Sequence, residues 1–436
     1  MGPEIIILVL AASAVGAAAG TFSGLVPGVH VNTLAALMLA AYPAIEAAMP
    51  GSVPDGYVPV LVGCVIMSAA AVHSFVDFVP SVFIGAPDPD EALSVLPAHR
   101  LLLEGHGMAA VRAAAVGSAV GAASAIALAV PMQWLLLHGL GPYLDAATFG
   151  VLAVTLAAII LMSPRPLASL ALAAAAGVLG WAVMNLGIPC RGIMGDGTML
   201  FPMLAGLFGL PPLLDRERAA DIPEQVDDGR DPVGPLPGLK GVLTGCIAGW
   251  FPGITAAAGS SLASALSREN DAASFISMTA SIGTVTSVFS LVTLSVSGSG
   301  RSGTALALKE VIGDSLEGFC SEAFVLILFS IAVSSAAGYA ITIGAGKAMA
   351  GIAERVPSDT LGTVSLLLIL ALVLLLTGPW GLAVLALSAA LGMAPPALGI
   401  GRVCLTACLI VPVLMSQAGL SPDVPVLLRR DSRCFK

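Results

Sequence analysis

A few ionisable side chains interrupt the long apolar runs of this sequence, and they are the first candidates for chemistry. His73 and Asp77 lie four residues apart in one apolar run, so on a helix they share a face and could pair. A charge in apolar surroundings is costly, which makes such residues functional candidates. The pair either carries a coupling proton or cation next to a binding site, or it is mutually satisfied and holds two helices together.

Two further acids, Asp88 and Asp90, stand in the proline-rich stretch PDPD. Their oxygen atoms could bind a coupling cation. Asp is also a preferred N-cap, and a helix is expected from Glu91, so for Asp90 capping is the favoured interpretation. His73, Asp77, Asp88 and Asp90 together form the candidate coupling-ion set.

The segment SGSGRSG, residues 297–303, combines glycines, hydroxyls and Arg301 directly before an expected helix. Backbone N–H groups at a helix start and a guanidinium suit an anionic group. The alternative is a loop at the membrane edge whose arginine extends to the surface. Ser299, Arg301 and Ser302 are therefore candidate substrate ligands.

A glycine and proline motif occurs twice. GTFSGLVPGVH, residues 20–30, and GCIAGWFPGIT, residues 245–255, share the pattern Gly, three residues, Gly, two residues, Pro-Gly. Proline removes a backbone donor and glycine tolerates positive φ, so each pair should end a helix. Matched breaks in two apolar segments are typical of a transporter's binding site. The candidate substrate ligands from these segments are Gly24, Pro27, Gly28, His30, Asn32, Pro252, Gly253 and Thr255.

The composition indicates which elements must position these residues. Hydrophobic residues make up 57% and charged residues 10%, which indicates a polytopic all-α membrane protein rather than a soluble domain. Long runs rich in Ala and Leu disfavour a β-barrel. A net charge of −9 gives no basis for nucleic-acid binding. The seven cysteines lack metal-type spacing, and no HExxH, P-loop or triad motif is present, so we expect neither an enzyme nor a cofactor or metal.

The chain divides into two homologous halves. We expect a first membrane repeat over 1–214, a hydrophilic, exposed and mobile linker over 215–239, a second repeat over 240–417 and a basic tail over 418–436. Each half runs from a Pro-Gly break, re-entrant or spanning, through a polar-bearing span to a Gly-rich break and a group of apolar helices. In the second half that span, 273–296, is rich in hydroxyls, which either line a cavity or join helices.

The distribution of charge favours an inverted rather than a parallel repeat. The first-half loop at 99–112 carries Arg100 and Arg112, whereas its counterpart at 312–322 carries only acids. By the positive-inside rule the first loop faces the cytoplasm and the second does not. The basic tail predicts a cytoplasmic C-terminus, in a multi-pass protein of the plasma membrane.

These motifs are similar to those of a known family. The two Pro-Gly segments, GAPDPDEALSVLPAHRLLLEG, SPRPLASLALAAAAGVLG and MLFPMLAGLFGLPPLL resemble the TctA-type large membrane subunit of the tripartite tricarboxylate transporters, in an archaeal-looking branch, over nearly the whole chain. The resemblance implies a permease for organic carboxylates driven by a proton or sodium gradient, with a small membrane subunit and an extracytoplasmic binding protein as partners. SRENDAASFISMTASIGT and HSFVDFVPSVF depart from the family's usual sequence.

A weaker resemblance, to the polyprenyl-phosphate translocases, also rests on paired Pro-Gly loops. It implies a flippase for an anionic lipid. A third alternative, a membrane scaffold without transport, is disfavoured because a broken span needs a cavity to line. Contact with membrane lipid is expected for each of these alternatives, and a homo-oligomer is compatible with each, although the sequence does not supply the oligomeric state.

Overall fold

The computed structural model of the chain describes most of its residues. They are 3–26, 31–49, 53–54, 56–83, 95–189, 191–192, 195–196, 199–214, 223–251, 256, 259–260, 263, 271–298, 302–353, 355 and 358–420. Every structural statement that follows concerns these residues.

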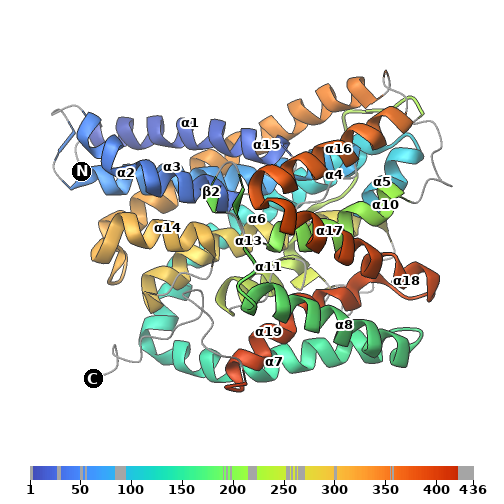
Figure 1. Cartoon of the computed structure of the whole chain (residues 1–436). Coiled ribbons are helices and arrows are strands. Elements are labelled where there is room, and N and C mark those ends of the chain that lie inside the picture. Colours follow the sequence, from blue (N-terminus) through green and yellow to red (C-terminus); the bar gives the residue numbers. More distant parts are fainter. Residues whose placement is uncertain are drawn as a thin grey trace.

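The first half is built from helices and one short hairpin (Figure 1). Its elements are α1 (Pro3–Leu25), α2 (Val31–Ala48), α3 (Tyr57–Val76), α4 (Phe78–Phe83), α5 (Val95–Leu103), α6 (Gly107–Leu135), the π-helical turn η1 (Leu136–Leu140), α7 (Gly141–Leu161), α8 (Pro166–Asn185), β1 (Arg191–Gly192), β2 (Gly195–Asp196), α9 (Leu200–Leu204), η2 (Ala205–Gly209) and α10 (Leu210–Leu214). β1 and β2 pair antiparallel.

The second half repeats this helical character. Its described elements are α11 (Pro235–Trp250), α13 (Ala272–Ser297), α14 (Gly303–Ile312), η4 (Gly313–Leu316), α15 (Glu322–Ala353), α16 (Ser358–Thr377), α17 (Pro379–Gly392), α18 (Ala394–Ala397), η5 (Arg402–Thr406) and α19 (Ala407–Gln417). Seven helices of the described chain are long and apolar enough to cross a membrane. The expected polytopic all-α class is confirmed.

Glycines at four-residue spacing bring α1 against α3. A Cβ added at Gly16 would lie 2.6 Å from the Ser68 Cβ, and one at Gly24 would lie 3.0 Å from the Val76 Cβ. Gly20 faces the backbone of Ala69 just as closely. The two helices therefore approach at a distance that only glycine permits, as small residues allow in membrane bundles.

The same contact recurs between α11 and α13. Gly241, Gly245 and Gly249 follow Gly16, Gly20 and Gly24 at a constant offset of 225 residues, since 241 − 16 = 225. A Cβ at Gly245 would lie 2.6 Å from the Val285 Cβ, and one at Gly249 would lie 2.6 Å from the Phe289 Cβ. The two motifs thus build equivalent helix pairs in the two halves.

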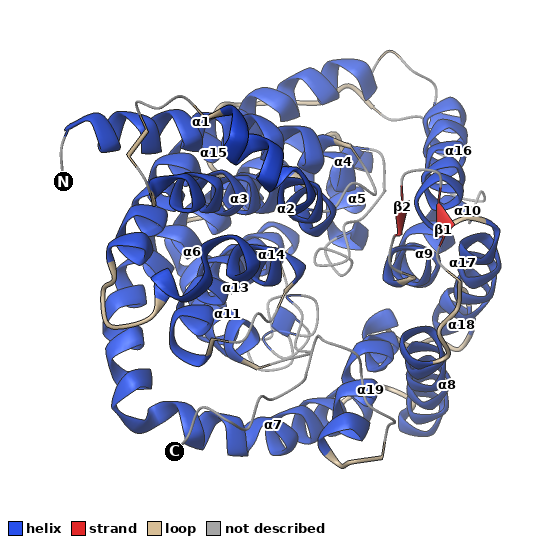
Figure 2. Cartoon of the chain, turned by 60° about the vertical axis from the view of Figure 1, so that its left-hand side comes forward, coloured by secondary structure: helices blue, strands red, loops and turns tan. Residues whose placement is uncertain are grey.

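The halves interlock around these pairs. α3 of the first half packs on α15 of the second, and α13 of the second half packs on α6 of the first. α6 and α15 also pack on each other, in opposite directions. Gly346, late in α15, lies against Val111, early in α6. At the other end, the Gln133 amide contacts Gly318 and Cys320, just before α15 begins. In Figure 2, α7, α8, α17 and α16 form an arc beside this bundle.

Helical backbone includes a proline at the end of the polar-bearing span. Prolines and a glycine in the stretch that starts at Phe78 predict a break in the helix, and of these only Pro80 lies within the described residues, in the helical segment Phe78–Phe83. α3 and α4 together form one candidate span, Tyr57–Phe83. Pro80 lies in the first turn of α4, where its missing N–H has no intrahelical partner to lose, so the ring is tolerated.

Candidate functional site

The candidate site comprises the helix ends that border the breaks in both halves. Among the candidates named from sequence, the structure describes Gly24, Asn32, His73, Asp77 and Ser302. The other ten lie outside the described residues: Pro27, Gly28, His30, Asp88, Asp90, Pro252, Gly253, Thr255, Ser299 and Arg301. The site is therefore built from the residues that flank the breaks.

Asn32 joins the first Pro-Gly segment to the Gly-rich break of the other half. It is the second residue of α2, and its Oδ1 accepts hydrogen bonds from the backbone N of Thr304 (2.9 Å) and from the Thr304 Oγ1 (2.8 Å). A Cβ at Gly303 would lie 2.9 Å from the Asn32 Cβ, so the two helix starts are in direct contact. α2 and α14 thus begin side by side, and in the sequence each follows one of the glycine-containing segments at which a break is expected.

The start of α14 is capped by the chain's own side chains. Ser302 adopts an extended conformation (φ −130°, ψ 164°), and its Oγ accepts from the backbone N of Ala305 at 3.1 Å. Ser302 is thus an N-cap, a role in which serine is favoured. Because Asn32 and Ser302 already occupy the Thr304 and Ala305 donors, these two candidate ligands shape the helix start rather than offer free donors.

His73 contacts a serine of the first Pro-Gly segment. Its Nδ1 lies 2.9 Å from the Ser23 Oγ, and the Ser23 hydroxyl lies 3.2 Å from the Gly20 carbonyl oxygen. Both side chains are buried. Gly24, the next residue, packs its backbone against His73 and Val76, so its role here is close approach rather than ligation.

Ser23 was missed in the sequence analysis. In the sequence, Ser23 is only a small polar residue just before Gly24 of the repeated motif. Nothing in the sequence pairs it with His73, which is 50 residues away. Thr304 was missed for the same reason, because its partner Asn32 is 272 residues distant.

Asp77 is the single turn residue between α3 and α4, and its backbone is itself helical (φ −60°, ψ −22°). Its backbone N donates to the His73 carbonyl (3.0 Å), and its own carbonyl accepts from the Ser81 Oγ (3.0 Å). The residue is only 4% exposed. A carboxyl group is therefore held at a helix junction inside the bundle, beside the histidine that contacts the first Pro-Gly segment.

Hydroxyl groups connect α3 of the first half to α13 of the second. The Ser74 Oγ lies 3.2 Å from the Thr284 Oγ1, between α3 and α13, and the Ser118 Oγ of α6 donates to the Ser74 carbonyl at 3.3 Å. Along α13, Thr293 donates to the Gly249 carbonyl of α11 (3.0 Å). Of the two readings of the hydroxyl-rich span, these contacts favour the joining of helices.

Within the described chain, no group of three or more His, Cys, Asp or Glu residues could hold a metal ion. The polar chemistry near the breaks therefore consists of helix starts, hydroxyls, one histidine and one carboxyl group. The histidine and the carboxyl group can bind a proton, and the two helix starts carry the positive ends of their dipoles, which favour negative charge.

Comparison with known proteins gives two matches. The family described as "Tripartite tricarboxylate transporter TctA family" matches residues 10–406. An uncharacterized protein of the archaeon Methanocaldococcus jannaschii is 29% identical over 300 residues, which cover 67% of this chain and 70% of that protein. No solved structure matches the chain.

Proposed function

Because this chain belongs to the tripartite tricarboxylate transporter TctA family, and is thus a membrane permease of that type, we propose that it carries a carboxylate-bearing organic anion driven by an ion gradient. The observation that supports the substrate class is the contact between Asn32 and Thr304. It brings together the N-termini of α2 and α14. The N-terminus of a helix carries the positive end of its dipole and favours negative charge. Two such ends beside the breaks suit a carboxylate, as in other transporters with broken helices.

We propose that His73 and Asp77 form the coupling site for a proton or sodium ion. Both are buried, and His73 is linked through Ser23 to the helix that leads into the first Pro-Gly break. A change in charge at this pair would act on that helix directly. Intramembrane ionisable residues in transporters commonly serve as such relays.

The repeat is proposed to be inverted. α6 and α15 occupy equivalent positions in the two halves, each packing on the polar-bearing span of the other, and they run antiparallel. An inverted pair with breaks in matching segments supports alternating access around a site between the halves. The expected partners are the small membrane subunit and the extracytoplasmic binding protein of tripartite systems, and the expected location is the plasma membrane.

Ligand stabilisation of the purified protein tests the substrate class. Tricarboxylates, dicarboxylates and polyprenyl phosphates would be compared for the rise in melting temperature that they cause, since a ligand bound only by the native state stabilises it. We expect a rise with a carboxylate. A rise with the prenyl phosphate alone would contradict the proposal and favour the lipid translocase.

Arg301 remains the proposed anion ligand of the second break. It immediately precedes Ser302, the N-cap of α14. A guanidinium grips a carboxylate through two parallel hydrogen bonds that lysine cannot reproduce. Calorimetry should therefore find weaker binding for Arg301→Lys and none for Arg301→Ala. Wild-type affinity in Arg301→Ala would refute this assignment while leaving the substrate class open.

A further inference from the structure

Part of the hydrophilic linker is hydrogen-bonded to the first membrane repeat. Residues 223–233, here called the linker strap, lie along the turn between α5 and α6. The backbone N of Val226 donates to the Gly105 carbonyl (2.8 Å), and the Gln225 Oε1 accepts from the backbone N of Gly107 (2.8 Å). The Gln225 amide also donates to the Leu102 carbonyl at 3.1 Å. Most residues of this stretch are exposed, as expected for the linker, but its backbone and Gln225 are hydrogen-bonded to the turn before α6.

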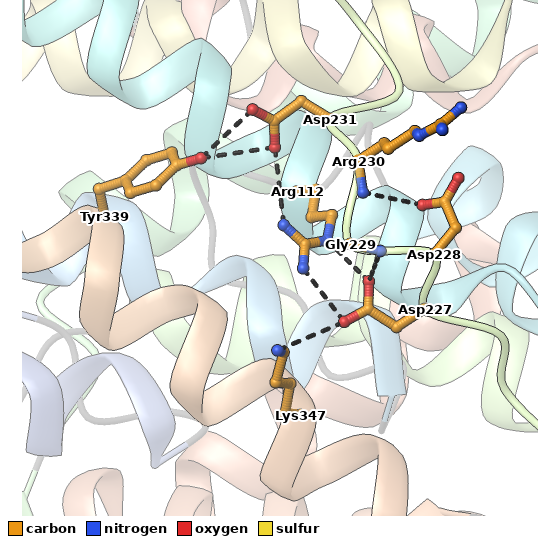
Figure 3. Close-up of polar contacts among 8 residues, drawn as sticks. All are labelled: Arg112, Asp227, Asp228, Gly229, Arg230, Asp231, Tyr339 and Lys347. Atoms are coloured by element: carbon orange, nitrogen blue, oxygen red, sulfur yellow. Dashed lines mark hydrogen bonds and ion pairs between the residues drawn. The ribbon is translucent and has the colours of Figure 1, made fainter.

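Ion pairs extend the strap across both halves of the molecule (Figure 3). Arg112 of α6 binds Asp227 through two bonds, Nε to Oδ1 at 2.8 Å and Nη2 to Oδ2 at 3.1 Å. Its Nη1 lies 3.7 Å from the Asp231 Oδ1. From α15, the Lys347 Nζ lies 3.6 Å from the Asp227 Oδ2, and the Tyr339 hydroxyl lies 3.4 Å from Asp231.

This cluster closes one end of the α6–α15 pair. Arg112 is buried, whereas Asp227 lies in an exposed stretch with its side chain 21% exposed, so the pair is shielded from solvent only on the Arg112 side. At the opposite end the same two helices are joined differently. There Gln133 accepts from the backbone N of Cys320 (3.0 Å) and donates to the Gly318 carbonyl (3.3 Å), contacts without any net charge.

The two ends of the antiparallel α6–α15 pair are thus joined by contacts of different strength, an ion-pair cluster at Arg112 and neutral hydrogen bonds at Gln133. Charged, bidentate hydrogen bonds are roughly twice as strong as neutral ones. They are also made or broken together, because removing one partner leaves a charge uncompensated. Since α6 and α15 belong to different halves, any rocking of one half against the other must change the separation at these ends.

We infer that the linker strap is an ionic latch, which holds the Arg112 end of the α6–α15 pair closed and must release for the halves to rock. The inference rests on the proposed transporter function for its purpose, but the latch itself can be tested without substrate. When the latch releases, we expect the Arg112 end to separate. The Gln133 end, which is already joined to Gly318 and Cys320, should then pack more tightly, as it would if two rigid helices pivoted on their packed centre.

The chain supplies a reporter for the far end. Cys320 is half-buried and bonded to Gln133, whereas Cys404 and Cys408 are buried among other helices. Maleimide labelling of the full-length protein, read at each cysteine peptide by mass spectrometry, therefore measures the far end, with Cys404 and Cys408 as internal controls for unfolding.

Asp227→Asn combined with Asp231→Asn removes the acids of the latch. We expect the labelling rate of Cys320 to fall at least about fivefold, the lower end of typical coupling between two sites. Asp228→Asn is the matched control, because Asp228 has the same charge in the same strap but bonds only the backbone N of Arg230 in the described contacts. It should leave the rate unchanged.

Arg112→Lys provides a milder variant that keeps the charge and loses the two-bond geometry, and its effect should be smaller in the same direction. An unchanged Cys320 rate in the acid-free variant would make the strap a purely local contact and overturn the latch. A faster rate would also overturn it, because both ends would then loosen together. Labelling at Cys404 or Cys408 would reveal unfolding, and the decision would then rest on Arg112→Lys.

Discussion

At the scale of single residues, the buried Asp77 should be essential for coupled transport. Asp77→Asn removes the charge at the α3–α4 junction but keeps the size of the side chain and both backbone hydrogen bonds. We expect uptake driven by an ion gradient in proteoliposomes to be abolished, with the melting temperature almost unchanged. Uptake at the wild-type rate from about pH 5 to pH 8, the range in which histidine titrates, would assign Asp77 a structural role.

Asp227 should give the protein an acid-sensitive contribution to stability. The Arg112 guanidinium, through its hydrogen bonds, lowers the pKa of the Asp227 carboxyl from 3.8 to about 2, against the opposing effect of burial. The groups that face it are Arg112 from α6, Lys347 from α15 and, through Arg112, Asp231 of the strap. A carboxyl group whose pKa is lower in the native state stabilises that state at pH values above its unfolded-state pKa. This stabilisation is lost as the pH falls toward the native-state pKa.

Because Asp227 lies in an exposed stretch, solvent screens its pairing with Arg112, and the contribution at neutral pH should be no more than about 1 kcal/mol. Asp227→Asn should therefore lower the melting temperature at pH 7, and the gap to the wild-type protein should narrow between about pH 4 and pH 2. Thermal unfolding monitored over this series measures the gap. A gap that stays constant down to pH 2 would mean that Asp227 contributes by packing and not by its charge.

Single residues also show where sequence reasoning reached its limit. The sequence drew attention to Asn32 and Ser302 because they are polar residues next to a Pro-Gly or Gly-rich segment, but it assigned both to substrate binding. The contact of Asn32 with Thr304 and the capping of α14 by Ser302 were not predicted. The ion pair between Arg112 and Asp227 could not be predicted, because the partners are 115 residues apart and each resembles an ordinary loop charge in the sequence. Charge pairing between distant segments is a property of the fold, and no local pattern reports it.

At the scale of helices, the repeated glycines should be required for close packing rather than for flexibility. Gly20→Ala places a methyl group against the Ala69 backbone, and Gly245→Ala places one 2.6 Å from the Val285 Cβ. Neither the Ala69 backbone nor the Val285 Cβ, which is fixed to its own backbone, can move aside cheaply, so each change should cost about 1–3 kcal/mol, as overpacking usually does. The effect should be similar in both halves, because the contacts are equivalent.

Gly150→Ala is the control for this pair of variants. Gly150 lies in α7 with nothing within 4 Å of an added Cβ. Alanine there should be neutral or stabilising by up to about 1 kcal/mol, because it lowers the entropy of the unfolded chain. Thermal unfolding of the three variants in one detergent ranks them. Equal stability of Gly20→Ala and Gly150→Ala would show that α1 and α3 can separate without cost.

These helix pairs explain which part of the fold the sequence could predict. The 225-residue offset of the motifs predicted two equivalent halves, and the equivalent pairs α1–α3 and α11–α13 agree with it. The sequence did not predict that the halves exchange partners. α6 of the first half packs on α13 of the second, and α15 of the second half packs on α3 of the first, which depends on how side chains fit between distant segments. A hydropathy pattern specifies which segments are apolar but not which of them meet.

At the scale of the whole molecule, the antiparallel course of α6 and α15 leads to a prediction about membrane sidedness. The two helices contain 29 and 32 residues, and about 20 residues suffice to cross a bilayer. Since they pack antiparallel, their N-terminal ends should lie on opposite sides of the membrane. Arg100 and Arg112 next to the start of α6 should make that side cytoplasmic by the positive-inside rule.

Cys320, just before α15, should then be reachable from outside, and a cysteine introduced by His106→Cys, just before α6, should be reachable only from inside. A membrane-impermeant maleimide applied to intact cells should label Cys320 and spare position 106, and after lysis it should label both. His106 is exposed and makes no side-chain cap at the start of α6, so the substitution should leave the fold intact. If both positions react in intact cells, the ends share one side, the repeat is parallel, and the rocking of inverted halves around the breaks has no structural basis.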